Sequence, residues 1–238
     1  MFINAIECLE WDSRFFGYSV AKIVLDAQGY YLIEDLFRQI VTEKIRLTYL
    51  FVPISQTRLN ILISDKGSIL VDQKTVFSKK TEKHIRFSND IIEYQETEIN
   101  DRLINLVLQA GLFSRFRLDI NFSDKEYEKL YIEWLTKSIN KTLAIKTFVV
   151  KNGSEIIGIT TLGERSKFAD IGLVAVDKNF RGRGIAYDLI HSADNTACGL
   201  GYDEIKVVTQ LQNKGACRLY EKCNFQIESI TNVYHYWQ

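Results

Sequence analysis

Apolar residues in the first third of the chain have spacings that predict a small α/β unit. Apolar runs at 18–25, 47–52 and 68–77 predict three strands. Between the first two runs, a helix is predicted over 34–45 because its apolar residues share one face. A second helix is expected between the last two runs. Alternation of strands and helices is typical of an α/β domain.

The pattern starts again after a polar segment, 78–83, which predicts a change of domain. Residues 99–110 and 127–135 have helical spacing, and a predicted hairpin follows, in which 147–150 and 155–161 flank Asn152-Gly153. This residue pair favours a turn with positive φ at both central positions. The predicted order from residue 99 onward is α-α-β-β-β-α-β-α-β. We expect a small α/β domain over 1–82 and a second domain over 83–238.

A glycine-rich segment, Arg181-Gly182-Arg183-Gly184, lies between a predicted buried strand, 169–176, and an amphipathic helix. Glycines let successive backbone N–H groups point into one concavity, and a helix N-terminus adds positive potential, so this segment predicts a pyrophosphate site. Taken alone, such a segment is more often a tight turn with exposed arginines. The chain has no G-x-x-x-x-G-K-[ST] motif and lacks the third glycine of G-x-G-x-x-G, which excludes a P-loop and a dinucleotide fingerprint.

Composition narrows the classes of partner. Thirty Lys and Arg balance thirty Asp and Glu, so nucleic acid is not an expected partner. The four cysteines form no CxxC pair and have no histidines at ligand spacing, which argues against a zinc site and a disulfide framework. No apolar run reaches the ~18 residues of a membrane span, and the start lacks a signal-peptide pattern. We therefore expect a cytoplasmic protein without a metal.

The glycine-rich segment resembles the acetyl-CoA loop of the GNAT family of N-acetyltransferases. Its pattern [QR]-x-x-G-x-[GA] is matched by Arg181, Gly184 and Ala186. A second element, resembling N-x-x-A-x-x-x-Y-x-x-x-G-F, begins at Asn213 and contains Tyr220. Asn224 stands where the family usually has glycine, and asparagine is the next best residue for a left-handed position. The resemblance implies a central twisted, splayed mixed sheet flanked by helices, with the smaller α/β unit before it.

The resemblance also implies a set of site residues and acetyl-CoA as co-substrate. The loop would hold the pyrophosphate, and the preceding strand would offer backbone groups to the pantetheine arm. The implied cofactor-binding residues are Val174, Ala175, Val176, Arg181, Gly182, Arg183, Gly184, Ile185, Ala186 and Asn213. Tyr220 would lie beside the thioester sulfur and protonate the departing thiolate in a direct transfer. No general base is assigned, and His191 is expected on the surface of a helix.

The acceptor is indicated by three further stretches, 9–17, 114–117 and 228–237. They resemble bacterial members of the family that acetylate a dTDP-linked amino-deoxy sugar for cell-surface polysaccharide. Arg115 and Arg117 would then contact the diphosphate, since guanidinium offers paired donors to phosphate oxygens. A solvated arginine pair between two helices is the equal alternative. Trp11, Phe15 and Phe16 are expected to form a buried aromatic cluster.

The sequence is also compatible with other functions. The acceptor could be another small-molecule amine or a protein lysine, and the chain could be a noncatalytic acyl-CoA-binding module. Retention of Tyr220 argues against the noncatalytic module. The sequence does not determine the oligomeric state, and a homodimer is compatible with it.

Overall fold

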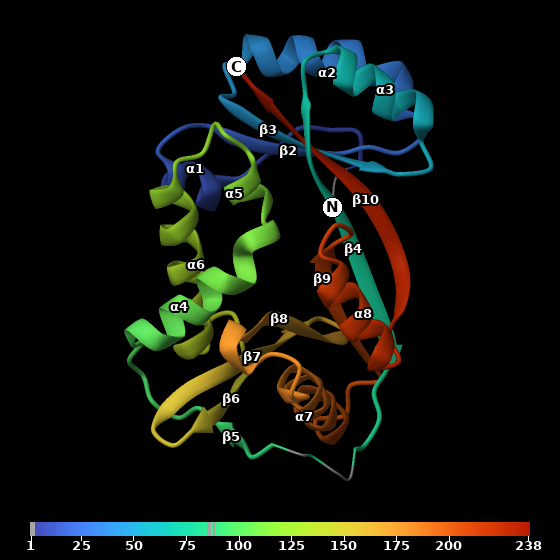
Figure 1. Cartoon of the computed structure of the whole chain (residues 1–238). Coiled ribbons are helices and arrows are strands. Elements are labelled where there is room, and N and C mark those ends of the chain that lie inside the picture. The colour runs from blue at the N-terminus through green and yellow to red at the C-terminus, as the bar shows by residue number, and fades with distance from the viewer. Residues whose placement is uncertain (1–2, 85–86, 88) are drawn as a thin grey trace. The chain divides into compact units, whose positions relative to one another are not determined.

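The computed structural model describes residues 3–84, 87 and 89–238, and it divides into two compact units (Figure 1). The first unit is Met1–Thr75 with Ser229–Gln238, and the second is Val76–Glu228. This division differs from the predicted boundary at residue 82, because the C-terminal strand returns to the first unit. Thr231 pairs with Pro53 and Trp237 pairs with Leu47, in antiparallel register. Polar composition alone cannot show where a terminal strand pairs.

The first unit is a mixed sheet with helices. Its strand order is β1-β2-β3-β10, in which β2 and β3 are parallel and the other pairs are antiparallel. The elements are β1 (Glu7–Cys8), α1 (Glu10–Phe16), β2 (Val20–Val24), α2 (Gly29–Thr42), β3 (Leu47–Pro53), α3 (Thr57–Asp65), the start of β4 (Ile69–Lys80) and most of β10 (Gln226–Trp237). Helix α2 buries Ile33, Leu36, Phe37 and Ile40, whose spacing gives it one apolar face. The predicted strands and both helices are present, although α2 begins five residues before the predicted start, at 29 instead of 34.

Helix α1 was not predicted, and it carries the aromatic residues of the start of the chain. Trp11 and Phe15 stack with ring centroids 5.0 Å apart, and Phe15 meets Phe16 edge-on at the same distance. All three side chains are half-buried, so the expectation of a buried cluster is wrong on burial. The rings form a cluster on a single short helix, which cannot enclose them by itself.

The second unit holds a mixed sheet with helices on both faces. The strand order is β9-β8-β7-β6-β5, and the end of β4 lies beside β9. The elements are β5 (Ile91–Glu93), α4 (Asp101–Ala110), η1 (Gly111–Phe113), α5 (Arg115–Leu118), α6 (Asp124–Ile139), β6 (Lys146–Asn152), β7 (Glu155–Arg165), β8 (Phe168–Val176), η2 (Lys178–Phe180), α7 (Ile185–Gly199), β9 (Glu204–Gln210) and α8 (Lys214–Lys222). The predicted order is confirmed from residue 99, with the short α5 added.

The hairpin turn between β6 and β7 lies one residue later than predicted. Asn152 is the last residue of β6 and pairs with Glu155, so Gly153 and Ser154 are the central residues of the turn. Gly153 has φ of +62°. Glycine at the first central position is typical of a type II′ turn, which needs positive φ only there.

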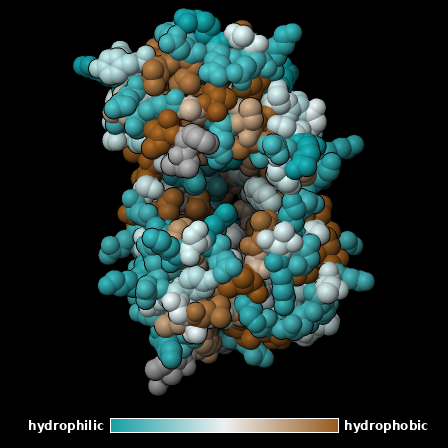
Figure 2. Space-filling model, turned by 180° about the vertical axis from the view of Figure 1, so that it is seen from behind, coloured by the Kyte–Doolittle hydropathy of each residue, from teal (hydrophilic) through white to brown (hydrophobic). Residues whose placement is uncertain are grey.

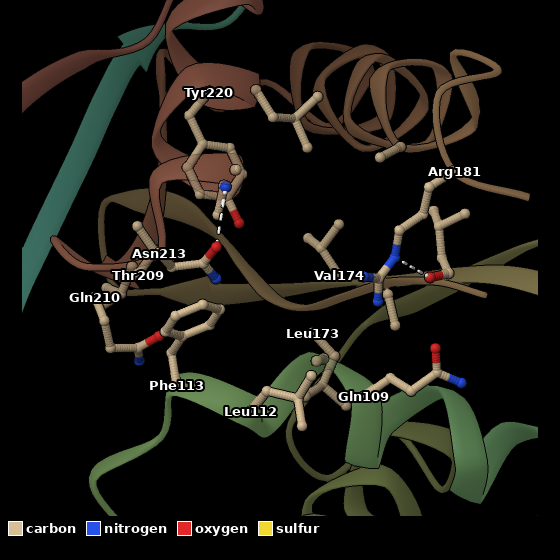
Figure 3. A pocket seen from close by; sticks show the side chains of 18 of the residues that line it. Gln109, Leu112, Phe113, Leu173, Val174, Arg181, Thr209, Gln210, Asn213 and Tyr220 are labelled. Carbon is tan, nitrogen blue, oxygen red and sulfur yellow. Dashed lines mark hydrogen bonds between the residues drawn. The ribbon is translucent and has the colours of Figure 1, made fainter. Parts of the chain in front are cut away.

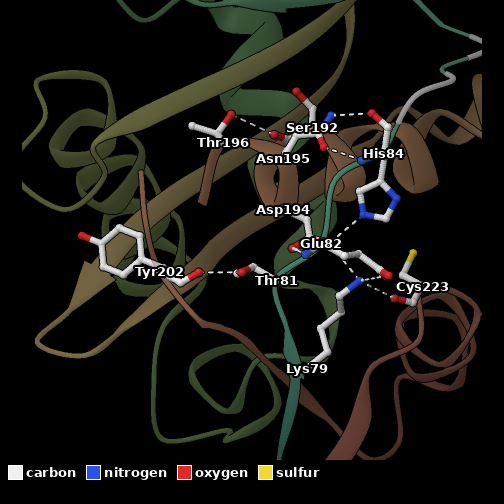
Figure 4. A network of polar contacts seen from close by, with 10 residues as sticks. All are labelled: Lys79, Thr81, Glu82, His84, Ser192, Asp194, Asn195, Thr196, Tyr202 and Cys223. Carbon is white, nitrogen blue, oxygen red and sulfur yellow. Dashed lines mark hydrogen bonds and ion pairs between the residues drawn. The ribbon is translucent and has the colours of Figure 1, made fainter. Parts of the chain in front are cut away.

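A buried polar network joins the segment after β4 to α7 (Figure 4). Asp194 is fully buried, and its Oδ2 lies 2.8 Å from Lys79 Nζ and 2.6 Å from His84 Nε2. Glu82 also pairs with Lys79. Burial by itself lowers the pKa of Lys79, but the hydrogen bonds that its ammonium donates to Asp194 and Glu82 outweigh this effect and raise the pKa above its ordinary value.

The carboxylates and the imidazole of this network form a group that could hold a metal ion: Glu82, His84 and Asp194 offer ligand atoms within 4.8 Å of one another. The Lys79 ammonium, however, already contacts both carboxylates. A lysine cation therefore compensates the charge that a metal would otherwise neutralise.

Hydrophilic and hydrophobic residues are interspersed over the face drawn in Figure 2. Among the described residues, no helix combines the length and the apolar character needed to cross a membrane.

Candidate active site

A cleft opens in the second unit where β8 leaves β9. The two parallel strands pair only over Ala169–Ile171, opposite Ile205–Val207. Beyond Ile171, β8 keeps its pairing with β7 on one side and borders a cavity of about 490 Å³ on the other. A cavity of this size is typical of small-molecule sites.

The register of β8 determines which backbone groups face the cleft. The Asp177 N–H donates to Ile157 O at 2.9 Å, which turns Asp177 towards β7. Because backbone groups alternate along an antiparallel strand, Ala175 also faces β7, whereas Val174 and Val176 present their N–H and C=O groups to the cleft. All three residues line the cavity.

The glycine-rich segment forms the end of the cavity nearest α7. Gly182 and Gly184 have φ of +79° and +78°, and Gly184 is the N-cap of α7. Residues other than glycine rarely adopt this backbone conformation, so glycine is strongly favoured at both positions of the loop. Arg181 lines the cavity, and its Nε donates to Val176 O at 3.0 Å (Figure 3). Gly182 and Ala186 line it as well.

Three predicted loop residues do not line the cavity. Ile185 is buried in the core beneath α7. The Arg183 guanidinium lies over the Phe180 ring, 4.9 Å from its centroid, and is exposed. The third is Gly184, the N-cap of α7.

Helix α8 supplies Asn213 and Tyr220 to the cavity wall opposite β8 (Figure 3). Asn213 is the N-cap, as predicted, because its Oδ1 accepts the Ala216 N–H at 3.2 Å. Tyr220 is 5% exposed, and burial raises the pKa of its hydroxyl far above the ordinary value. The hydroxyl therefore stays protonated throughout the neutral range. Asn224 has φ of +66°, the left-handed conformation expected there.

The other wall of the cavity comes from residues that sequence reasoning did not assign to the site. They are contributed by the end of α4, by η1 and by the end of β9: Gln109, Leu112, Phe113, Thr209 and Gln210 (Figure 3). Leu112 and Phe113 are 40% and 38% exposed. In the sequence, the only indication that these residues belong to the site is the apolar pair directly after a predicted helix, and no motif marks that pair.

Of the two arginines assigned to the acceptor, Arg117 lines a second cavity of about 390 Å³. Lys178 and Arg102 add cationic groups there, and Gln109 and Leu112 border both cavities. Arg102 is already paired with Asp177 at 2.7 Å. Arg115 lines neither cavity, and its guanidinium lies 4.6 Å from the centroid of the Phe116 ring.

His191 is buried at 6% exposure, so the expectation of a surface histidine is wrong. Its ring stacks on His84 with centroids 3.7 Å apart, and it also contacts the Tyr187 ring. Burial, and next the charge of His84, lower the pKa of His191 to about 4. The imidazole is therefore neutral at pH 7 and belongs to the α7 packing surface.

Comparison with known proteins agrees with this geometry. Residues 112–225 match the acetyltransferase (GNAT) family. The dTDP-fucosamine acetyltransferase of Escherichia coli is 26% identical over 98% of this chain and 96% of that protein. The spore coat polysaccharide biosynthesis protein SpsD of Bacillus subtilis is 29% identical, over 52% of this chain and 43% of that protein.

Solved structures share the fold. A GCN5-related N-acetyltransferase from Sphaerobacter thermophilus superposes with a TM-score of 0.62 at 15% identity, over 98% of this chain and 76% of that one. The predicted fold class is thereby confirmed. The splayed strands, the glycine loop at the start of α7 and the family match together identify residues 112–225 as an acetyltransferase domain of the GNAT family.

Proposed function

We propose that the protein transfers the acetyl group of acetyl-CoA to the amine of a nucleotide-linked amino-deoxy sugar, a precursor of cell-surface polysaccharide. The observation that carries the proposal is the cleft between β8 and β9, which has a glycine loop at one end and a protonated Tyr220 in its wall. The sugar acceptor is supported by the names of the relatives, one of which aligns over nearly the whole chain.

In this proposal the cofactor uses the cleft from end to end. The pyrophosphate binds the backbone N–H groups of the Gly182–Gly184 loop and the N-terminus of α7, where the helix dipole favours anions. The pantetheine arm then runs along β8 and takes the strand-edge positions that β9 leaves unpaired, against Val174 and Val176. The thioester lies near Tyr220 and the amine attacks it directly, with no covalent enzyme intermediate.

Replacing Gly184 with valine should raise the Kd for acetyl-CoA at least about ten-fold, or about 1.4 kcal/mol, as measured by calorimetry. Gly184 has φ of +78°, and a β-branched residue there distorts the loop that presents the N–H groups. Gly201→Val is a matched control because Gly201 also has positive φ, +87°, but follows the C-cap of α7 (Leu200), at the opposite end of the helix from the glycine loop. Both variants should lose stability, and only Gly184→Val should lose affinity. Unchanged affinity in folded Gly184→Val would remove the loop from cofactor binding.

The diphosphate of the acceptor is proposed to bind in the second cavity, beside Arg117 and Lys178. Arg117→Ala should therefore raise the KM for the acceptor about ten-fold and leave the KM for acetyl-CoA within about two-fold. Arg115→Ala should have a smaller effect, because Arg115 lines neither cavity. Arg165→Ala, which removes an exposed arginine at the end of β7, is the charge-matched control. Equal acceptor KM values in Arg117→Ala and Arg165→Ala would contradict this placement.

The function itself is tested by CoA release with dTDP-4-amino-4,6-dideoxygalactose, the free amino sugar, a lysine peptide and a polyamine as acceptors. We expect the nucleotide conjugate to have the highest kcat/KM, since only it offers a diphosphate to the cationic cavity. A free sugar, peptide or polyamine that reacts as well would overturn the nucleotide-sugar proposal. The acetyltransferase activity would remain.

A further inference from the structure

Strand β8 contains one residue more than β7 at the point where the cleft begins. Thr160 pairs with Val174, whereas Leu162 pairs with Ile171, so Thr161 alone lies opposite both Gly172 and Leu173. An extra residue of this kind is a β-bulge, which bends the strand and changes where its backbone groups point. The bulge begins directly after Ile171, the last residue of β8 that pairs with β9.

The Thr161 side chain accepts a hydrogen bond from a backbone N–H group of this bulge. Its Oγ1 accepts the Leu173 N–H at 2.8 Å, in the position that a β7 carbonyl would take in a regular ladder. Thr161 is 2% exposed, so water cannot replace the hydroxyl. A Cβ at Gly172 would lie only 2.8 Å from this hydroxyl, and the absence of a side chain at Gly172 therefore makes room for it.

The hydrogen bond to Thr161 orients the Leu173 N–H towards β7 and thereby sets the orientation of the N–H group of the next residue. Because neighbouring N–H groups alternate along a strand, Val174 presents its N–H to the cleft when Leu173 presents its own to Thr161. We propose that Thr161 is a positioning residue of the transfer reaction, which aims the Val174 N–H at the thioester carbonyl and so stabilises the oxyanion that forms on it. The inference rests on acetyl-CoA occupying the cleft, as proposed above.

The experiment compares Thr161→Val, Thr161→Ser and Thr160→Val. Valine keeps the shape of threonine and removes the acceptor, whereas serine keeps the hydroxyl. Thr160 is a matched control: it is the neighbouring residue of β7, fully buried, and its Oγ1 has no hydrogen-bond partner among the described residues. We expect kcat to fall about 10- to 100-fold in Thr161→Val, since removing one oxyanion donor costs about 10²- to 10³-fold and here the donor is only displaced. Thr161→Ser and Thr160→Val should stay within about three-fold of the wild type.

A second measurement separates positioning from a structural role. The infrared stretch of bound acetyl-CoA labelled with carbon-13 at the thioester carbonyl should lie at lower frequency than in water, because a donated hydrogen bond weakens the C=O bond. This shift should be lost in Thr161→Val and retained in Thr161→Ser, with the Kd for acetyl-CoA changed less than about three-fold. If Thr161→Val does not fold, Thr161→Cys, whose thiol is a weak acceptor, takes its place.

The outcomes are distinguishable. Wild-type protein that does not bind acetyl-CoA would overturn the proposed function. Binding with the same carbonyl frequency and the same kcat in all variants would overturn the role of Thr161 and leave the proposed function standing. A kcat that falls equally in Thr160→Val and Thr161→Val would mean that β7 packing, not the hydroxyl, is responsible, and would also overturn that role.

Discussion

Tyr220→Phe should lower kcat by about 10²- to 10⁴-fold, the usual contribution of a positioned general acid. The ring and its packing against Phe77 and Phe225 are kept in this variant. Because the ring contacts are unchanged, removing the hydroxyl should hardly change the free energy of unfolding. The Kd for acetyl-CoA should also stay nearly constant, which places the loss in the transition state.

Burial raises the pKa of the general acid, Tyr220, and that of the leaving group, the CoA thiol. An aqueous thiol has a pKa of about 8.5 and a phenol about 10, and burial raises the pKa of Tyr220 further. Burial raises the pKa of the departing thiolate in the same cleft, because a charge on sulfur is no longer solvated. Because Tyr220 stays protonated over the pH range of the assay, a fall in kcat at alkaline pH would be due to the deprotonation of another group.

The control for this prediction is Tyr131→Phe, which removes a hydroxyl from the α6 side of the same cavity. Its kcat should change by less than about ten-fold. Single-turnover measurements are needed so that chemistry, not product release, limits the rate. A Tyr220→Phe protein with a wild-type single-turnover rate would exclude Tyr220 as the acid, and positioning of amine and thioester would then supply the acceleration.

Asp194→Ala should reduce the free energy of unfolding by about 3–5 kcal/mol, the usual cost of removing one partner of a buried ion pair. Asp194 is fully buried and holds both Lys79, which is 5% exposed, and His84. Its loss leaves the Lys79 ammonium buried, with Glu82 as the remaining carboxylate of the network. Urea unfolding measures the change, and the m-value should stay constant.

Asp35→Ala is the matched control, because Asp35 and Arg38 form an ion pair whose side chains are 72% and 73% exposed. Such a pair contributes at most about 1 kcal/mol. The double variant Lys79→Met with Asp194→Leu should recover much of the loss, since it removes both charges. If Asp194→Ala were no more destabilised than Asp35→Ala, the network would not be an important source of stability.

The sequence by itself determined the order of elements in the second unit and the glycine loop at one end of the cleft. Local signals suffice for these features. Glycines at 182 and 184 are needed wherever the chain adopts positive φ before a helix, and an asparagine with a tyrosine seven residues later marks one helix. Each signal involves residues close together in the chain, so no knowledge of distant contacts was required.

Only the tertiary structure decided the features that depend on pairing between distant segments. The return of β10 to β3 moved the unit boundary, and the one-residue offset between β7 and β8 placed the Thr161 hydroxyl under Leu173. Lys79 and Asp194 lie 115 positions apart, yet they share a buried ion pair. Strand register and burial follow from how the whole sheet packs, because shifting a strand by one residue reverses every side chain and backbone group along it.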